Sequence, residues 1–137
     1  NLKASKIMKN YDVSACTDIT GFGLFGHAYE MSFNRCTIVF DMQNIPILEE
    51  AKAMASMGII PAGAYTNKAY LDDKVARSQV HSDEIMLFDA QTSGGLLMAV
   101  SQKDAPLLLS HLHDEGLIYS AMIAEVVSRE EKALRYM

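Results

Sequence analysis

The longest strictly apolar run in the chain is Leu96–Val100, which follows directly on Gly94 and Gly95. A continuous apolar run of this length predicts a β-strand with the buried character of a central strand, covered on both of its faces. The run is far shorter than the ~20 apolar residues of a membrane-spanning helix, so no membrane segment is expected. A strand of this kind needs other elements to cover it, and the rest of the sequence has to supply them.

Helical and strand patterns alternate along the chain. Strand character is found in residues 13–19, 36–40, 96–100 and 119–127. Helical character is found in residues 1–10, 21–33, 48–57 and 101–115. Pro61 and Gly63 indicate a loop over residues 59–67. This order predicts one α/β (α+β) domain over residues 1–137, with a mixed β-sheet of about four or five strands and helices packed on it.

The charge balance and the cysteines narrow the function classes. Twelve Lys and Arg against 17 Asp and Glu give a formal charge of −5. A non-specific nucleic-acid binder carries a basic face, so no nucleic-acid partner is expected. Cys16 and Cys36 form no CxxC pair and are expected to be buried thiols of a cytoplasmic protein. Because the sequence opens on Asn1 and shows no signal peptide, a fragment of a longer cytoplasmic polypeptide is expected.

A glycine-rich segment, residues 21–26 (GFGLFG), matches the GxGxxG pattern of dinucleotide-binding folds. Asp41 stands where that pattern has its ribose-binding acid, 41 − 21 = 20 residues after the first glycine. However, the pattern belongs after a buried apolar strand, and residues 14–20 are half polar. Asp18 would also repel a pyrophosphate unless a cation lay between them. A dinucleotide-binding module therefore remains only as an alternative.

Asp18 is the candidate metal ligand. It is expected at the end of a strand and just before a helix, where a carboxylate supplies a hard ligand for Mg²⁺ and backbone N–H groups favour phosphate oxygens. Thr20 and Gly21 are the candidate phosphate contacts, through the Thr20 hydroxyl and through the close approach that a glycine allows. In the alternative interpretation, Asp18 only caps the helix, which would begin at Thr20, and the glycines only permit tight packing.

A second glycine-containing segment, residues 89–97, leads into the apolar run. Its polar part can form a nest of backbone N–H groups for a phosphate. The alternative is a turn in which Gly94 and Gly95 adopt positive φ and the hydroxyls of Thr92 and Ser93 satisfy loop amides. Ser93 lacks the GxSxG context of a nucleophile, and we assign no catalytic residue within this chain.

Both segments resemble one family. Residues 15–27 (ACTDITGFGLFGH), followed by Glu30 and Met31, resemble the TDxTGFGLxGH…EM segment of the selenophosphate synthetase (selenide, water dikinase) family, within the aminoimidazole-ribonucleotide-synthetase-like superfamily. Residues 89–97 (DAQTSGGLL) resemble that family's DPQTSGGLL, and residues 61–67 resemble its PGG…N. The family's N-terminal segment, with its Cys or selenocysteine and its Lys, has no counterpart here. The resemblance is therefore to the C-terminal domain.

The resemblance implies an enzyme that makes selenophosphate from selenide, ATP and water and releases AMP and phosphate. It implies that Asp18 is a Mg²⁺ ligand and that the other metal ligands and the catalytic residues lie in an N-terminal domain packed against this one. The parent enzyme is expected to be a homodimer, and the isolated chain is expected to be inactive. The C-terminal domain of another ATP-dependent enzyme of the superfamily, or a domain without a ligand, remain as alternatives.

Overall fold

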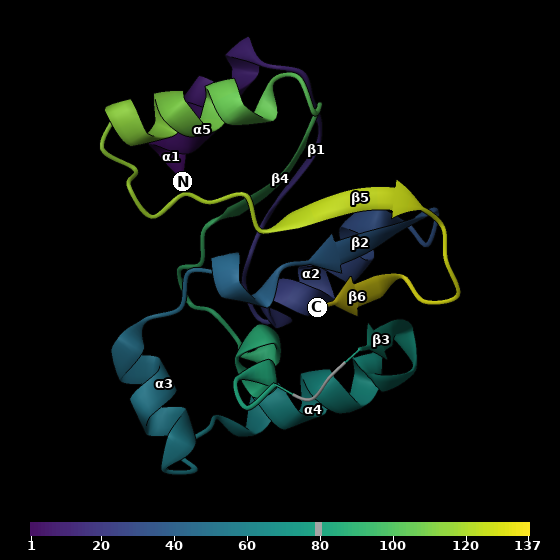
Figure 1. Cartoon of the computed structure of the whole chain (residues 1–137). Coiled ribbons are helices and arrows are strands. Elements are labelled where there is room, and N and C mark those ends of the chain that lie inside the picture. Colours follow the sequence, from purple (N-terminus) through teal and green to yellow (C-terminus); the bar gives the residue numbers. More distant parts are fainter. Residues whose placement is uncertain (79–80) are drawn as a thin grey trace.

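The computed structural model describes residues 1–78 and 81–137. Its strands are β1 Val13–Asp18, β2 Cys36–Phe40, β3 Val75–Arg77, β4 Leu96–Val100, β5 Ala124–Ser128 and β6 Leu134–Tyr136. Its α-helices are α1 Leu2–Ile7, α2 Gly23–Ser32, α3 Glu49–Ser56, α4 Ala62–Leu71 and α5 Ala105–Asp114. Short 3₁₀ helices are η1 Met8–Asn10, η2 Met42–Asn44, η3 Asp72–Lys74 and η4 Glu84–Phe88. The predicted α/β class is confirmed (Figure 1).

The strands form two sheets rather than the single mixed sheet that was expected. Strands β3, β6, β2 and β5 form a mixed sheet in that order, while β1 and β4 form a separate antiparallel ribbon. β4 was expected to be a central strand, and this prediction was wrong. Leu97 of β4 packs in the main core, whereas Met98 and Val100 pack against a second core. The strand is apolar on both faces because it runs between two cores.

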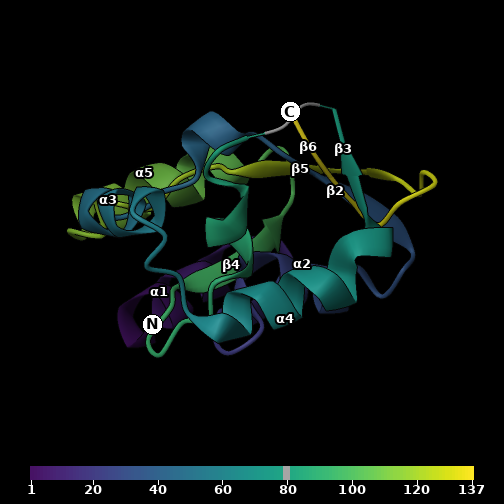
Figure 2. The same cartoon turned by 90° about the horizontal axis from the view of Figure 1, so that it is seen from below.

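The main core lies between α2 and the four-stranded sheet. Phe25 of α2 is fully buried, and its ring centroid lies 4.8 Å from that of Phe40, 5.4 Å from that of Phe88 and 6.1 Å from that of Tyr136. These contacts join the glycine-rich segment to β2, η4 and β6. Helix α4 lies beside α2 (Figure 2). The aromatic cluster therefore holds α2 against the four-stranded sheet and η4.

The smaller core joins α1, α5 and the ribbon. Ile7, Leu108 and Leu112 are buried together, with Met98 and Val100 packed against them. Figure 1 shows α1 and α5 side by side at one end of the molecule, with the β1–β4 ribbon leading from them to the main core. No helix among residues 1–78 and 81–137 is long and apolar enough to cross a membrane.

Several local predictions need correction. Residues 59–67 were expected to form a loop, but α4 begins within them, after Pro61 at its N-cap. Proline is tolerated at a helix start, because the first amide has no partner within the helix. The predicted last strand, residues 119–127, begins later, at Ala124. Both cysteines were expected to be buried, but Cys36, the first residue of β2, is half-buried. Cys16 is exposed, because alternate residues of β1 face solvent.

The buried carboxylate of Glu84 links η4 to α4 and β3 through ion pairs. Glu84 is 7% exposed, and it accepts hydrogen bonds from Lys68 Nζ of α4 (2.7 Å) and Arg77 Nε of β3 (2.5 Å). Burial by itself raises the pKa of Glu84, but these two donors outweigh burial, and the pKa lies below its ordinary value. The ion pairs thereby hold the segment that leads into residues 89–95.

We expect Glu84→Gln to lower the free energy of unfolding by about 1–3 kcal/mol at neutral pH, because Lys68 and Arg77 lose their buried counter-charge. A carboxyl whose pKa is lowered in the folded state stabilises the fold above its unfolded pKa of about 4.3 and loses that contribution as the pH falls through the folded pKa. The difference between wild type and variant should therefore shrink at acidic pH.

Urea unfolding followed at neutral pH and again near pH 3 measures both values. Glu49→Gln is the matched control, since the Glu49 side chain is 82% exposed and pairs with Lys52 within one helix. An equal loss of stability at both pH values would show that the Glu84 charge does not provide the stabilisation.

Candidate functional site

The site is built where the β1–β4 ribbon ends. Asp18, the last residue of β1, is paired with Leu96, the first residue of β4. Beyond this pair the two segments remain hydrogen-bonded through their backbones. The Ile19 N–H donates to the Gly95 carbonyl (3.0 Å), and the Gln91 N–H donates to the Thr20 carbonyl (2.9 Å). Residues 18–20 and 91–95 therefore lie against each other.

Gly94 allows these two segments to touch. A Cβ on residue 94 would lie 2.2 Å from the Ile19 carbonyl oxygen, which is closer than real atoms approach. The positive-φ glycines are Gly23, Gly58 and Gly116, so the expected turn with positive φ at Gly94 and Gly95 is wrong. Gly94 is required by the space available, not by its backbone conformation.

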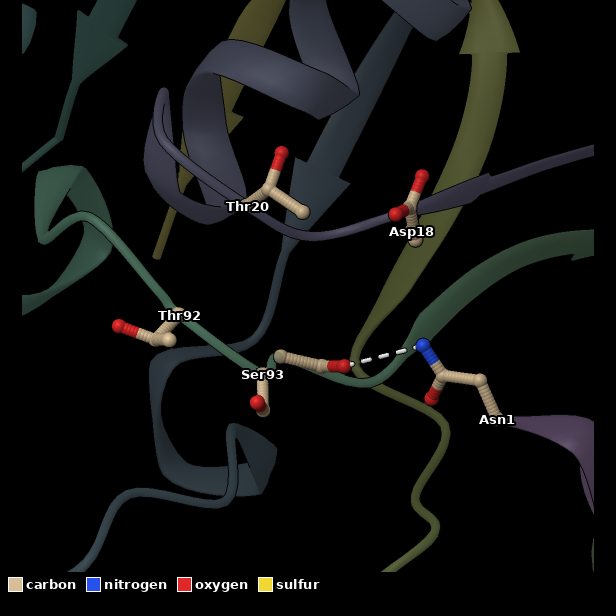
Figure 3. Close-up of a pocket in the computed structure, with 6 residues that line it drawn as sticks. Asn1, Asp18, Thr20, Thr92 and Ser93 are labelled. Atoms are coloured by element: carbon tan, nitrogen blue, oxygen red, sulfur yellow. Dashed lines mark hydrogen bonds between the residues drawn. The ribbon is translucent and has the colours of Figure 1, made fainter.

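A cavity of about 320 Å³ lies between the two segments (Figure 3). Its lining residues carry carboxylate, hydroxyl, amide and backbone groups: Asn1, Asp18, Thr20, Thr92, Ser93 and Gly94. Asp18 is the one ionisable side chain among them. The cavity is therefore a polar space that carries a single negative side chain.

The Asp18 carboxylate is exposed, and no residue in the described part of the chain donates a hydrogen bond to it. The interpretation of Asp18 as a helix cap is wrong, because α2 starts at Gly23 after Phe22 as N-cap, and no side chain in the described part of the chain caps it. The pKa of the neighbouring Cys16 is raised, first by partial burial and second by the charge of Asp18. An unpaired carboxylate at a polar cavity is suited to hold a hard cation.

Thr20 and Gly21 lie before the N-terminus of α2 and are not part of its first turn. The Thr20 hydroxyl is hydrogen-bonded to Nε2 of the buried His27 (3.0 Å), and its carbonyl accepts from the Gly23 N–H. The helix therefore does not begin at Thr20, as was expected, but at Gly23. Gly21 is exposed, and a Cβ there would meet nothing within 4 Å. The fold therefore does not require a glycine at position 21. The phosphate contact assigned to Gly21 remains a prediction.

Asn67 of α4 is a site-supporting residue that local sequence reasoning missed; only the resemblance to PGG…N pointed to it. Its Nδ2 donates both to the Gly21 carbonyl (3.0 Å) and to the Phe88 carbonyl (2.9 Å). Asn67 therefore ties the glycine-rich segment to the end of η4, from which residues 89–95 depart.

Comparison with known proteins shows the family to which the chain belongs. The profile of the family described as AIR synthase related protein, C-terminal domain, matches residues 2–137. The chain belongs to this family. It is 48% identical to a selenide, water dikinase of Caldanaerobacter subterraneus subsp. tengcongensis, over 96% of this chain and 39% of that protein. It is 43% identical to a selenide, water dikinase of Aliarcobacter butzleri, over 98% of this chain and 39% of that protein.

Solved structures agree on the fold of this AIR synthase related domain. E. coli HypE, a hydrogenase maturation protein, superposes with a TM-score of 0.65 at 20% identity, over 98% of this chain and 34% of that chain. A second HypE structure gives a TM-score of 0.68 at 21% identity. At this level of identity the likeness concerns the fold. The chain spans 39% of the length of the two dikinases above.

The second and third glycines of the GxGxxG pattern, Gly23 and Gly26, serve packing. A Cβ on Gly23 would lie 2.7 Å from the Phe88 carbonyl carbon, and one on Gly26 would lie 2.4 Å from the Phe22 Cβ. The preceding strand belongs to an antiparallel ribbon, not to a parallel sheet. Asp41 accepts hydrogen bonds at the start of η2. The dinucleotide-binding alternative is therefore wrong.

We expect Gly94→Ala to lower the free energy of unfolding of the domain by about 1–3 kcal/mol, because the added Cβ pushes the loop off the Ile19 carbonyl. Gly95→Ala is the matched control, since a Cβ there meets nothing within 4 Å and the residue has no positive φ. Chemical denaturation of both variants measures the difference. Equal stabilities would show that the close approach does not constrain residue 94.

Proposed function

We propose that this domain is the C-terminal part of a selenide, water dikinase, which makes selenophosphate from selenide, ATP and water and releases AMP and phosphate. Two dikinases by that name are 48% and 43% identical to it over nearly its whole length. Asp18, the residue that the family resemblance assigns to a metal, lines a polar cavity at the end of β1. The parent enzyme is a cytoplasmic homodimer in this proposal, and its N-terminal domain supplies the catalytic residues.

The unpaired Asp18 carboxylate at the cavity is the observation that carries the assignment. The atoms at the cavity that could coordinate a metal ion are oxygens: those of the Asp18 carboxylate, of hydroxyl groups and of the backbone. Oxygen atoms are the ligands that Mg²⁺ prefers. In the described part of the chain, no three His, Cys, Asp or Glu residues gather into a metal site. Mg²⁺ takes about six oxygens, so the others come from water, from the ATP phosphates and from the N-terminal domain.

Bound Mg²⁺ would supply positive charge between the polyphosphate of ATP and the enzyme. The chain's own residues orient the substrate around that charge. His27 holds the Thr20 hydroxyl at the cavity, and Gly21 leaves open space in which phosphate oxygens approach the backbone. Asn67 keeps Gly21 in place through its carbonyl. In this proposal the domain contributes one metal ligand and a fixed polar wall.

In the full-length enzyme, Asp18→Asn should reduce selenide-dependent AMP formation by ~10–100-fold, which corresponds to losing ~1.4–2.7 kcal/mol of transition-state stabilisation. The substitution keeps the size of the side chain and removes its charge, and Asp18 has no partner in the described part of the chain, so the unfolding midpoint should stay nearly unchanged. Asp12→Asn, an exposed carboxylate outside the cavity, is the control. Full activity of Asp18→Asn at limiting Mg²⁺ would refute the metal assignment.

The isolated domain should form no AMP from ATP and selenide, because the nucleophile and the remaining metal ligands belong to the N-terminal domain in this proposal. Chromatographic detection of AMP, with and without selenide, measures this. AMP formation above that of a blank, in a preparation whose Asp18→Asn variant is inactive, would show that the domain carries a complete active site.

A further inference from the structure

The wall of the cavity opposite Asp18 has hydrogen-bond donors that the fold does not use. Thr92 and Ser93 are exposed, and their hydroxyls make no hydrogen bond with any residue in 1–78 or 81–137. Within the same ranges, the backbone N–H groups of residues 92–94 have no acceptor either. The interpretation in which Thr92 and Ser93 satisfy loop amides is thereby wrong.

These donors lie on a loop that is fixed on both sides. The Gln91 N–H is bonded to Thr20 and the Gly95 carbonyl to Ile19, while Gly94 rests against the Ile19 carbonyl. Asn1 Nδ2 also donates to the Gly94 carbonyl (3.2 Å; Figure 3). A loop held in this way loses little conformational freedom when a ligand binds.

The charges around the cavity define the class of ligand. Among the residues that the structure describes, no Lys, Arg or His side chain lines the cavity, and Asp18 is negative, so a bare anion is repelled. An oxyanion that carries its own cation suits both walls: the cation lies by Asp18 and the oxyanion accepts hydrogen bonds from the loop. Such an ion pair is what a Mg²⁺-bound phosphate presents.

We propose that Thr92 and Ser93, with the adjacent backbone N–H groups, bind the oxygens of a Mg²⁺-bound phosphoryl group. This inference rests on the proposed function, because it takes Asp18 as the metal ligand. Figure 3 shows the Ser93 hydroxyl pointing away from Asp18. Contact therefore requires rotation about χ1, which an exposed side chain makes between staggered rotamers.

The test measures binding to the full-length enzyme, not its activity. The variant Thr92→Val/Ser93→Ala removes both hydroxyls and keeps the side chains close in size. Its control is Thr66→Val/Ser56→Ala, which removes exposed hydroxyls from helices outside the cavity. Calorimetry gives the affinity for a non-hydrolysable ATP analogue and for inorganic phosphate, each with Mg²⁺. Electron paramagnetic resonance of Mn²⁺ without any anion gives the affinity for the ion alone.

We expect the cavity variant to bind at least one of the two phosphate ligands ~10–100-fold more weakly, as for the loss of hydrogen bonds to a charged group, and to bind Mn²⁺ as the wild type does. Weaker binding of the analogue alone identifies the nucleotide as the source of the phosphoryl group. Weaker binding of inorganic phosphate alone identifies the free product. Unchanged affinity for both ligands, or a loss that the control variant shares, would overturn the inference.

Asp18→Asn separates this inference from the proposed function. If Asp18→Asn weakens Mn²⁺ binding while the cavity variant binds both phosphate ligands normally, the loop inference fails and the metal assignment holds. If Asp18→Asn leaves Mn²⁺ binding unchanged, the metal assignment fails, and with it the Mg²⁺-bound ligand proposed for the loop.

Discussion

The cavity at the end of β1 depends on the direct contact of two backbone segments of the chain, with no side chain between them. The Ile19 carbonyl occupies the space that a Cβ on residue 94 would need, and the Phe88 carbonyl occupies the space that a Cβ on residue 23 would need. Such contacts are open only to glycine. They place the end of β1 beside the loop that enters β4, and they place the start of α2 beside the end of η4. The two glycine-rich segments thus build the walls of the cavity by packing, before any ligand is considered.

Local signals in the sequence predicted the elements better than their pairing. β2 was predicted with its observed bounds, because a run of β-branched and aromatic residues is typical of a buried strand. The same reasoning failed for the pairing of β4. Its residues are apolar on both faces, as in a central strand, but the cover comes from two separate cores. The apolar pattern of a strand shows that both of its faces are covered, but it does not show which elements cover them.

Short elements and long-range contacts escaped prediction for a different reason. β6 has three residues and follows a charged segment, yet it pairs with both β2 and β3, and its Leu134 and Tyr136 are fully buried. Three residues are too few to show a period. Asn67 gave no local signal either, since its two acceptors lie 46 and 21 residues away in the sequence. Asp18 was recognised as a site candidate because its position at a strand end, before a glycine-rich turn, is a local feature.

The arrangement of charge at the cavity supports the part in ligand binding that we propose for the domain. The chain carries a formal charge of −5, and its cavity presents one carboxylate opposite neutral hydrogen-bond donors. Neutral donors discriminate by geometry, while a single carboxylate attracts cations and repels anions. In our proposal, a cavity built from both recognises an oxyanion only together with its metal ion. Metal and phosphate binding would then be coupled by the same two segments that Gly94 brings into contact, and the close packing of their backbones would determine which ligand the cavity accepts.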